Sequence, residues 1–496
     1  MIIDLILQFT IQSLPLDIAS LLSGFALILV LLATAGNKYK KIASSITAIG
    51  FGLGIILLVA GAMGYFGAIP GYVFPEMLSS DWVSILFGVA VLSASLLIAL
   101  TASDYLGNLP NVVSFYSLLV FTTIGALLLT FSSDLLMIFV AWEMMSIPSY
   151  VLTGFRKKDS DSSEAAVKYF IMSAFASAVL LYGISLVYLL TGSTNLYTIV
   201  TAAKGYDPIA VLALTFVIAG FGIKLAAVPF HMWIPDAYQG APTIVSALLS
   251  AGTKGAVFAP AARIFFIVFA AKAFQADWSV TFAALAILSM TLGNFAALTQ
   301  KHVTRILAYS SIGQAGYILI GFAAGGVDGL TGSFFHILNY SIMQTAAFLS
   351  AALIIKQLGS DELSKFDGVG RRIKIAPIAF TLSLLALGGF PPLNGFWSKF
   401  VLFYSAINAN LGWLAIIAIL NSFVSIAFYV RIVKHMYVDG EEGLSKLNET
   451  SGFKLALIAA SVIIVLIGIY PYPFIQFASI AANSFLHGTT AGFLHG

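Results

Sequence analysis

The sequence predicts an all-α polytopic membrane protein with about 14 transmembrane helices. The chain of 496 residues is 60% hydrophobic and only 9% charged, and its mean hydropathy is +0.99. A soluble domain carries about 25% charged residues, so this composition is typical of a protein that crosses a membrane many times. The lengths of the apolar stretches and the placement of the basic residues support the same prediction.

The apolar stretches are long enough to span, because a transmembrane helix needs about 20 mainly apolar residues. We predict spans at residues 15–35, 42–67, 82–102, 111–131, 134–155, 164–190, 207–230, 241–270, 276–298, 303–325, 329–355, 375–406, 411–433 and 453–475. The seventh contains Pro229, and the twelfth contains GGFPPLNG at residues 388–395. Proline removes a backbone donor and breaks helices, so we predict that helices 7 and 12 are broken.

The basic residues test this topology, because cytoplasmic loops carry an excess of Lys and Arg. With these spans, one set of loops holds nearly all of them, namely Lys38, Lys40, Lys41, Arg156, Lys157, Lys158, Lys301, Arg305, Lys356, Lys365, Arg371, Arg372, Lys374, Arg431, Lys434, Lys446 and Lys454. The opposite loops hold Lys204 and Lys272. We therefore expect a multi-pass protein of the cell membrane with both termini on the non-cytoplasmic side.

The order of the spans indicates an internal repeat. Spans 4–8 (residues 111–270) and spans 9–13 (residues 276–434) form two blocks of five helices, each with a broken helix. An odd number of spans inverts the second block, which is the pattern of inverted-repeat transporters. A three-helix segment (residues 1–110) precedes the blocks, and a C-terminal helix and tail (residues 453–496) come after them.

Several functional classes are excluded or disfavoured. The chain has no cysteine, which excludes disulfides, thiol catalysis and cysteine-held metal clusters. It has no glycine-rich phosphate loop, and we expect no bound cofactor, no metal and no nucleic acid partner. The start, MIIDLILQFTIQSLPLD, lacks a basic region and a cleavage site, so we expect mature sequence. The longest polar loop, residues 356–374, is long enough for a short surface helix but not for a catalytic domain.

Four ionisable residues deep within the spans are the strongest candidates for function: Glu143, Lys224, Lys254 and Lys399. A central lysine costs roughly 2.5–3.5 kcal/mol on insertion scales and is usually functional. A Glu143–Lys224 pair would keep the lysine charged, and its separation would let the proton leave. The alternatives are a static ion pair joining spans 5 and 7, and a Lys224 side chain that reaches the interface.

Other polar residues are weaker candidates. Lys168 and Glu164 form an i,i+4 pair that either ends a helix or joins a relay. His231 adjoins the break of span 7, and His336 lies within span 11; each can titrate or serve as a structural hydrogen-bonding group. We expect Arg263 to be structural. A sodium site would need several hard oxygen ligands, whereas a series of lysines suits protons.

The sequence around these residues resembles that of a known family. The segments that carry this resemblance are 142–155, 164–196, 224–259, 307–321 and 388–400. The chain resembles the antiporter-like membrane subunits of respiratory complex I, which are related to Mrp-type cation/proton antiporter subunits. It is most similar to subunit N of the NADH-quinone oxidoreductase group, because subunit M carries a glutamate at the position of Lys399 and subunit L a long C-terminal lateral helix.

The resemblance implies fourteen helices in two inverted five-helix repeats, with helices 7 and 12 broken. The family's functional residues on helices 5, 6, 7, 8 and 12 match Glu143, Lys168, Lys224, Lys254 and Lys399. The match does not fix a role for His336. Such a chain translocates protons as part of a membrane arm, while quinone, flavin and iron–sulfur clusters lie in other subunits. The electron donor, whether NADH, ferredoxin or a deazaflavin, is left open, and a subunit of a multisubunit cation/proton antiporter is the alternative.

Overall fold

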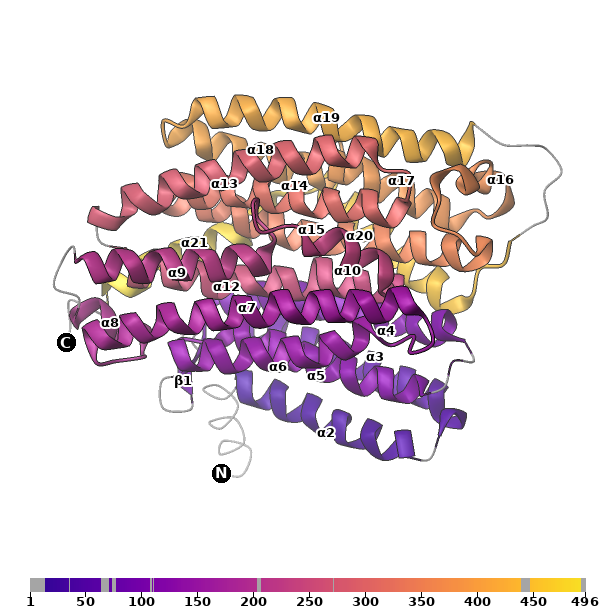
Figure 1. Cartoon of the computed structure of the whole chain (residues 1–496), viewed down its shortest axis with the longest axis horizontal. Coiled ribbons are helices and arrows are strands. Elements are labelled where there is room, and N and C mark those ends of the chain that lie inside the picture. The colour runs from indigo at the N-terminus through magenta and orange to yellow at the C-terminus, as the bar shows by residue number, and fades with distance from the viewer. Residues whose placement is uncertain are drawn as a thin grey trace.

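The computed structural model describes residues 14–34, 36–63, 71–73, 77–107, 109, 111–202, 207–270, 272–438 and 447–491. Nearly all of these residues are helical, and most helices run side by side along one direction (Figure 1). In the described part, twelve segments are long and apolar enough to cross a membrane, and two shorter apolar helices accompany them. The predicted class, an all-α polytopic membrane protein, is confirmed.

The described residues before Gly107 are mostly helical, with one short pair of strands. They contain α2 (Leu14–Thr34), the 3₁₀ turn η1 (Asn37–Tyr39), α3 (Lys40–Ala62), strands β1 (Gly71–Val73) and β2 (Leu78–Ser80), and α4 (Trp82–Leu106). The strands pair antiparallel, with Gly71 opposite Ser80. The sequence analysis did not anticipate this pair of strands, because strands of three residues carry too little alternation to be recognised.

Three of the next five helices begin at acidic caps. The five helices are α5 (Val112–Phe131), α6 (Leu135–Thr153), α7 (Ser160–Thr191), the short α8 (Leu196–Ala202) and α9 (Pro208–Leu225). Asp134, Asp159 and Asp207 cap α6, α7 and α9, and each carboxylate accepts a hydrogen bond from backbone N–H groups in the first turn. A side-chain acceptor at this position satisfies donors that the helix leaves free.

Helix 7 is broken as predicted, but the segment after the break is a further helix and not a loop. α9 ends at Leu225, where Ala226 adopts φ 53°, and the new helix, α10 (Trp233–Gly240), starts after Pro229. The indole N–H of Trp233 donates to the carbonyl of Ile223 at 2.9 Å, which ties α10 to the end of α9. The sequence analysis assigned these residues to a loop because proline and aspartate favour turns.

The eighth span is not a regular helix. It consists of α11 (Thr243–Ala247), the π-helical turn η2 (Leu248–Thr253), α12 (Lys254–Arg263) and a second π-helical turn η3 (Ile264–Val268). Its apolar stretch is fully buried inside the molecule. π-Helical turns occur frequently at functional sites, and η2 ends directly before Lys254.

The second half begins with three long helices and also contains a broken one. The elements are α13 (Lys272–Thr299), α14 (Val303–Ala324), α15 (Gly326–Leu358), α17 (Ile375–Gly388), α18 (Asn394–Asn408) and α19 (Gly412–Tyr437). α17 and α18 are separated at the predicted break. Both breaks contain a cis X–Pro bond, at Val228–Pro229 and Pro391–Pro392. The inverted repeat itself stays a prediction.

The remaining elements lie between and after these helices. The polar loop predicted to form a short surface helix contains the 3₁₀ turn η4 (Leu363–Phe366) and α16 (Val369–Arg372). The last elements are α20 (Ser451–Ile469) and α21 (Tyr472–Ala491). The sequence analysis predicted a single helix and a tail here, and Pro471 separates the two helices.

The described basic loops gather at one end of the bundle, the end that carries α16 in Figure 1, opposite α8 and β1. Hydrogen bonds join these loops: Arg156 donates to the carbonyl of Ala241 at 3.1 Å, and the carbonyl of Arg372 accepts from the backbone N–H of Leu447 at 3.1 Å. This one-sided placement agrees with the positive-inside pattern. Lys204, Lys446 and residues 1–13, where we predict mature sequence, lie outside the described residues.

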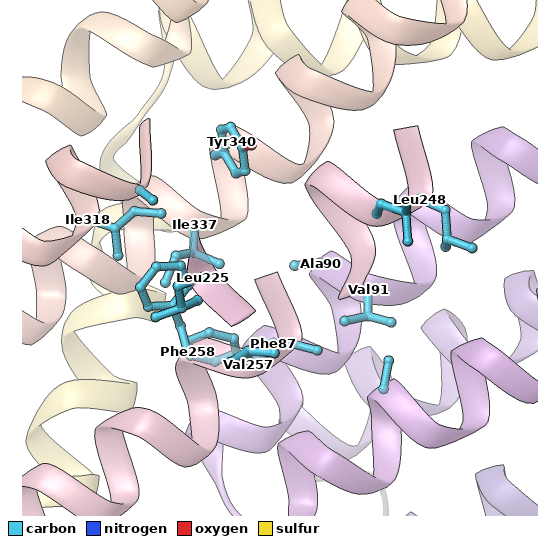
Figure 2. Packing of buried hydrophobic residues seen from close by; sticks show 14 of the residues in the cluster. Phe87, Ala90, Val91, Leu225, Leu248, Val257, Phe258, Ile318, Ile337 and Tyr340 are labelled. Atoms are coloured by element: carbon cyan, nitrogen blue, oxygen red, sulfur yellow. The ribbon is translucent and has the colours of Figure 1, made fainter. Parts of the chain in front are cut away.

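The core lies where the two halves meet. α15 packs against α4, α14, α17, α18, α20 and α21, and its apolar stretch is fully buried. Figure 2 shows Phe87 beside Val257 and Phe258, close to the side chains of α14 and α15. Aromatic rings from different helices meet edge to face, as Phe87 and Phe334 do at 5.3 Å, which adds to the energy of burial. The candidate residues are therefore held by rigid, buried helices.

Candidate functional site: a buried line of lysines

Lys224 lies in the last turn of α9 and is 5% exposed. Its amine donates to the hydroxyls of Ser146 and Ser173, each at 2.7 Å, and lies 3.4 Å from the hydroxyl of Tyr169. It also lies 5.5 Å from the centre of the Trp142 ring. The carbonyl end of a helix carries partial negative charge, so the break of helix 7 gives the ammonium a favourable site.

Glu143 lies on α6, half-buried, one turn from the serine that binds Lys224. The hydroxyl of Ser177 donates to its carboxylate, and the indole N–H of Trp142 donates to the same hydroxyl at 3.1 Å. In the described structure no direct ion pair joins Glu143 to Lys224. They are connected through α7, where Ser177 contacts the carboxylate and Ser173 the amine.

Lys254 follows the π-helical turn η2 and is 3% exposed. Its amine donates to the backbone carbonyl of Ser311 at 2.8 Å and lies 3.1 Å from the hydroxyl of the same residue. That hydroxyl shares a hydrogen bond of 2.9 Å with the hydroxyl of Tyr340. Lys254 therefore joins the first half of the chain to α14 and α15 of the second half.

Lys399 lies on α18, just after the second break. Its amine donates to the hydroxyl of Ser422 at 2.9 Å and to the carbonyl of Gly388, the last residue of α17, at 3.3 Å. It also lies 4.3 Å from the centre of the Tyr317 ring. The amine again meets the carbonyl end of a half-helix. A cavity of 240 Å³ adjoins the side chain.

His336 lies between the Lys254 and Lys399 groups and is fully buried. Its Nδ1 is 2.9 Å from the hydroxyl of Ser398, the neighbour of Lys399, and its Nε2 is 3.1 Å from the side-chain oxygen of Gln314. Its ring stacks on the ring of Tyr340 at 6.5 Å. Ser398 adjoins Lys399, and the side-chain N–H of Gln314 donates to the carbonyl of Leu387 beside the second break at 3.0 Å. The stacked ring of Tyr340 links His336 to the Lys254 group.

Lys168 lies apart from the central line, in a half-exposed ion cluster. Its amine is 2.7 Å from a carboxylate oxygen of Glu164 and 2.7 Å from one of Asp236. Asp236 also pairs with Arg305 of α14 at 2.9 Å. A cavity of 200 Å³ opens at this cluster. The predicted i,i+4 pair is present, and Asp236 connects the two halves of the chain.

Two candidates lie away from the line. His231 is in the break of helix 7, half-buried, and its Nδ1 is buried without a hydrogen-bond partner in the described structure. Arg263 is fully buried, and its guanidinium pairs with both oxygens of Asp81 at 2.7 and 2.9 Å. Burial of Asp81 acts to raise the pKa of its carboxyl, but the Arg263 guanidinium outweighs this and holds that pKa below its usual value. This pairing agrees with the expectation that Arg263 is structural.

The structure thus places Lys224, Lys254, His336 and Lys399 in one sequence of buried groups, with Glu143 at its start. The sequence analysis missed the hydroxyl and amide groups between them: Ser146, Tyr169, Ser173, Ser177, Ser311, Gln314, Tyr340, Ser398 and Ser422. No sequence signal distinguishes them, because serine in a membrane helix commonly bonds to its own backbone.

Comparisons with known proteins identify the family of this chain. Residues 132–425 match the family described as NADH:quinone oxidoreductase/Mrp antiporter, transmembrane region. The F(420)H(2) dehydrogenase subunit N of Methanosarcina mazei is 39% identical over 83% of this chain and 85% of its own length. The NADH-quinone oxidoreductase subunit N of Trichlorobacter lovleyi is 39% identical over the same shares.

A solved structure supports the same assignment. A chain of respiratory complex I from Thermus thermophilus, solved with bound aureothin, is similar with a TM-score of 0.79 and 31% identity, covering 93% of this chain and 99% of that one. The matched family region contains Glu143, Lys224, Lys254 and Lys399. The chain is an antiporter-like membrane subunit that belongs to the NADH:quinone oxidoreductase/Mrp antiporter family.

Proposed function

We propose that this chain moves protons across the cell membrane as a membrane-arm subunit of a quinone-reducing, complex I-type dehydrogenase. The protons pass along a relay of Glu143, Lys224, Lys254, His336 and Lys399. Each amine holds or releases one proton, and the hydroxyls between the amines carry it onward. Lys168 lies at the cytoplasmic mouth, next to the cavity at its ion cluster, and His231 lies beside the break of helix 7.

One observation carries the proposal: three lysines that are 5%, 3% and 3% exposed are each bound by hydroxyl or carbonyl oxygens and lack a direct carboxylate partner in the described structure. Ionisable side chains within membrane helices are rare, pair with one another or with backbone carbonyls, and mark ion pathways and proton relays. An amine held by neutral oxygens can gain and lose a proton without breaking an ion pair, which suits proton transfer.

We expect the redox steps to occur in other subunits of the complex. The relatives are named as subunits of an F(420)H(2) dehydrogenase and of NADH-quinone oxidoreductases, which supports membership of such an enzyme. Quinone, flavin and iron–sulfur clusters would then lie in partner subunits, and this chain would bind none of them. The blocks at residues 111–270 and 276–434 would act as two inverted halves around Lys254, with both termini on the non-cytoplasmic side.

The second candidate is a subunit of a multisubunit cation/proton antiporter. The matched family includes Mrp antiporters, and the relay does not itself require a redox partner. Purification of the native complex decides between the two, because a dehydrogenase complex contains quinone-reducing subunits with iron–sulfur clusters and an antiporter complex does not.

The relay is tested by K224M and K399M in the intact complex. Methionine keeps the length of the side chain and removes the amine, so each variant should lose proton pumping by about tenfold or more. Protons moved per electron and the rate of quinone reduction are measured together in sealed vesicles.

K365M is the matched control, since Lys365 is exposed in the polar loop, and we expect it to pump normally. Wild-type pumping in both K224M and K399M, with normal assembly, would refute the relay.

A further inference from the structure

The relay has a gap between its first two lysines. Lys224 reaches the hydroxyl of Tyr169, and Lys254 reaches the hydroxyl of Ser311, but in the described structure no hydrogen bond connects these two groups. Proton transfer between the lysines needs a group in that space.

Tyr238 of α10 occupies this position. An aromatic series leads to it from the first lysine: Tyr169 stacks on Trp233 at 4.9 Å, and Trp233 meets Tyr238 edge to face at 6.4 Å. On the other side, the hydroxyls of Ser311 and Tyr340, which are bonded to each other at 2.9 Å, are neighbours of the Tyr238 hydroxyl. It therefore lies between the surroundings of Lys224 and those of Lys254.

The hydroxyl of Tyr238 is also unusual in its own surroundings. The side chain is 0% exposed, and its oxygen has no hydrogen-bond partner in the described structure. Buried hydroxyls are nearly always bonded, and an exception requires an explanation such as a water molecule or a role in chemistry. Several tyrosines of the relay region are bonded, including Tyr340 to Ser311 at 2.9 Å.

The ring itself is held firmly. It meets Phe348 of α15 edge to face at 5.9 Å, and the hydroxyl of Ser246 donates to the backbone carbonyl of Tyr238 at 2.7 Å. The unbonded oxygen therefore has a fixed place within a packed helix, at the short helix that the sequence analysis assigned to a loop.

We propose that the Tyr238 hydroxyl is the proton-bridging group between Lys224 and Lys254. This inference rests on the proposed relay and names one further residue in it. The class of ligand at this point is water, which joins the phenol to Tyr169 on one side and to Ser311 on the other.

The step balances without a cofactor. The Lys224 ammonium gives a proton to the Tyr169 hydroxyl, which passes its own proton to a bridging water. That water passes a proton to the Tyr238 oxygen as the phenol proton leaves through a second water toward Ser311. The Ser311 hydroxyl accepts this proton and passes its own to the neutral Lys254 amine. Each oxygen gains one proton and loses one, so Lys224 becomes neutral, Lys254 becomes charged, and Tyr238 ends unchanged.

The test is Y238F in the intact complex, with Y182F as the matched control. Phenylalanine keeps the ring and its contacts and removes only the hydroxyl. Tyr182 is a half-exposed tyrosine on α7 that packs on Phe216 at 4.8 Å. We expect the proton-pumping rate of Y238F to fall by about tenfold or more. The ratio of its pumping rates in H₂O and D₂O should also differ from that of the wild type. Y182F should match the wild type in both.

The outcomes separate this inference from the relay. Loss of proton pumping in K224M, K399M and Y238F supports both the relay and the role of Tyr238 in it. Loss in the lysine variants with wild-type pumping and an unchanged isotope ratio in Y238F overturns the role of Tyr238 and leaves the relay. If Y238F fails to assemble, S311A decides: reduced pumping supports the bridge, and wild-type pumping overturns it.

Discussion

At the scale of single residues, hydroxyl groups of α7 contact both ionisable residues in the first half of the proposed relay. Ser173 and Ser177 lie one turn apart on the same face of the helix, and they contact Lys224 and Glu143 respectively. The carboxylate and the amine are therefore held by neighbouring side chains of one helix face, in a buried region where charges interact more strongly than in water. The hydrogen bond from Ser177 to Glu143 and the negative charge of Glu143 are two separate contributions to proton transfer at Lys224.

E143Q and S177A separate them. The glutamine keeps an oxygen for Ser177 and removes the charge, so pumping should fall about tenfold, equal to about 1.4 kcal/mol of coupling. S177A keeps the charge of Glu143, so its proton pumping should fall less than that of E143Q. Proton pumping per electron in sealed vesicles measures both, and a larger loss in S177A than in E143Q would assign the effect to the hydrogen bond.

At the scale of elements, the irregular helices are fastened by buried polar contacts. The eighth span passes from a regular helix into the π-helical turn η3 directly after Arg263. The Arg263–Asp81 pair ties this end of the span to the start of α4, where Asp81 is also the N-cap. Removing one partner of a buried pair leaves an uncompensated charge, which costs about 3–5 kcal/mol.

D81N should therefore lower the thermal midpoint of the detergent-solubilised complex clearly at neutral pH. D207N is the control, because Asp207 caps α9 without a guanidinium partner and asparagine caps equally well. We expect the thermal midpoint of D207N to remain close to that of the wild type. An equal loss of thermal midpoint in both variants would contradict the role of the Arg263–Asp81 pair.

The pH dependence of this contribution follows from the sign of the shift. The folded pKa of Asp81 is lower than its ordinary 3.8, so the stabilisation is complete above the ordinary value and is lost as the pH falls through the folded pKa. The deficit of D81N should stay constant from about pH 8 to about pH 5 and shrink only below the ordinary pKa. Thermal midpoints over this range measure it.

At the scale of the whole molecule, the two halves meet in two different ways. In the interior, Lys254 contacts Ser311 and α15 packs on both halves. At the end that carries the basic loops, the Lys168–Asp236–Arg305 cluster joins α7, α10 and α14. The interior contact is buried, whereas the side chains of the cluster are partly exposed.

A double-mutant cycle of D236N and R305Q should therefore give a small coupling. The side chains are 38% and 25% exposed, and exposed pairs contribute up to about 1 kcal/mol, less at high salt. Thermal midpoints of the single and double variants at low and high salt measure it. A coupling of several kcal/mol that salt does not change would show that this cluster, and not the interior, holds the halves together.

Much of the fold was predictable from composition and proline placement. The apolar stretches and the two breaks follow from local chemistry, because burying backbone in lipid demands helices and proline interrupts them. The helix α10, the π-helical turns and the second C-terminal helix were not predictable, because their residues favour turns locally and only packing against other helices stabilises them.

The sequence by itself determined the membrane class, the helix breaks, the one-sided basic loops and the buried lysines, since each follows from the cost of placing charge or open backbone in lipid. It also carried the resemblance to the family. Only the tertiary structure decided that Glu143 meets Lys224 through serines, that His336 lies between two lysine groups, and that Tyr238 lies in the gap. These contacts join residues from distant segments, and an apolar helix with a serine or tyrosine has the same local sequence whichever partner it meets.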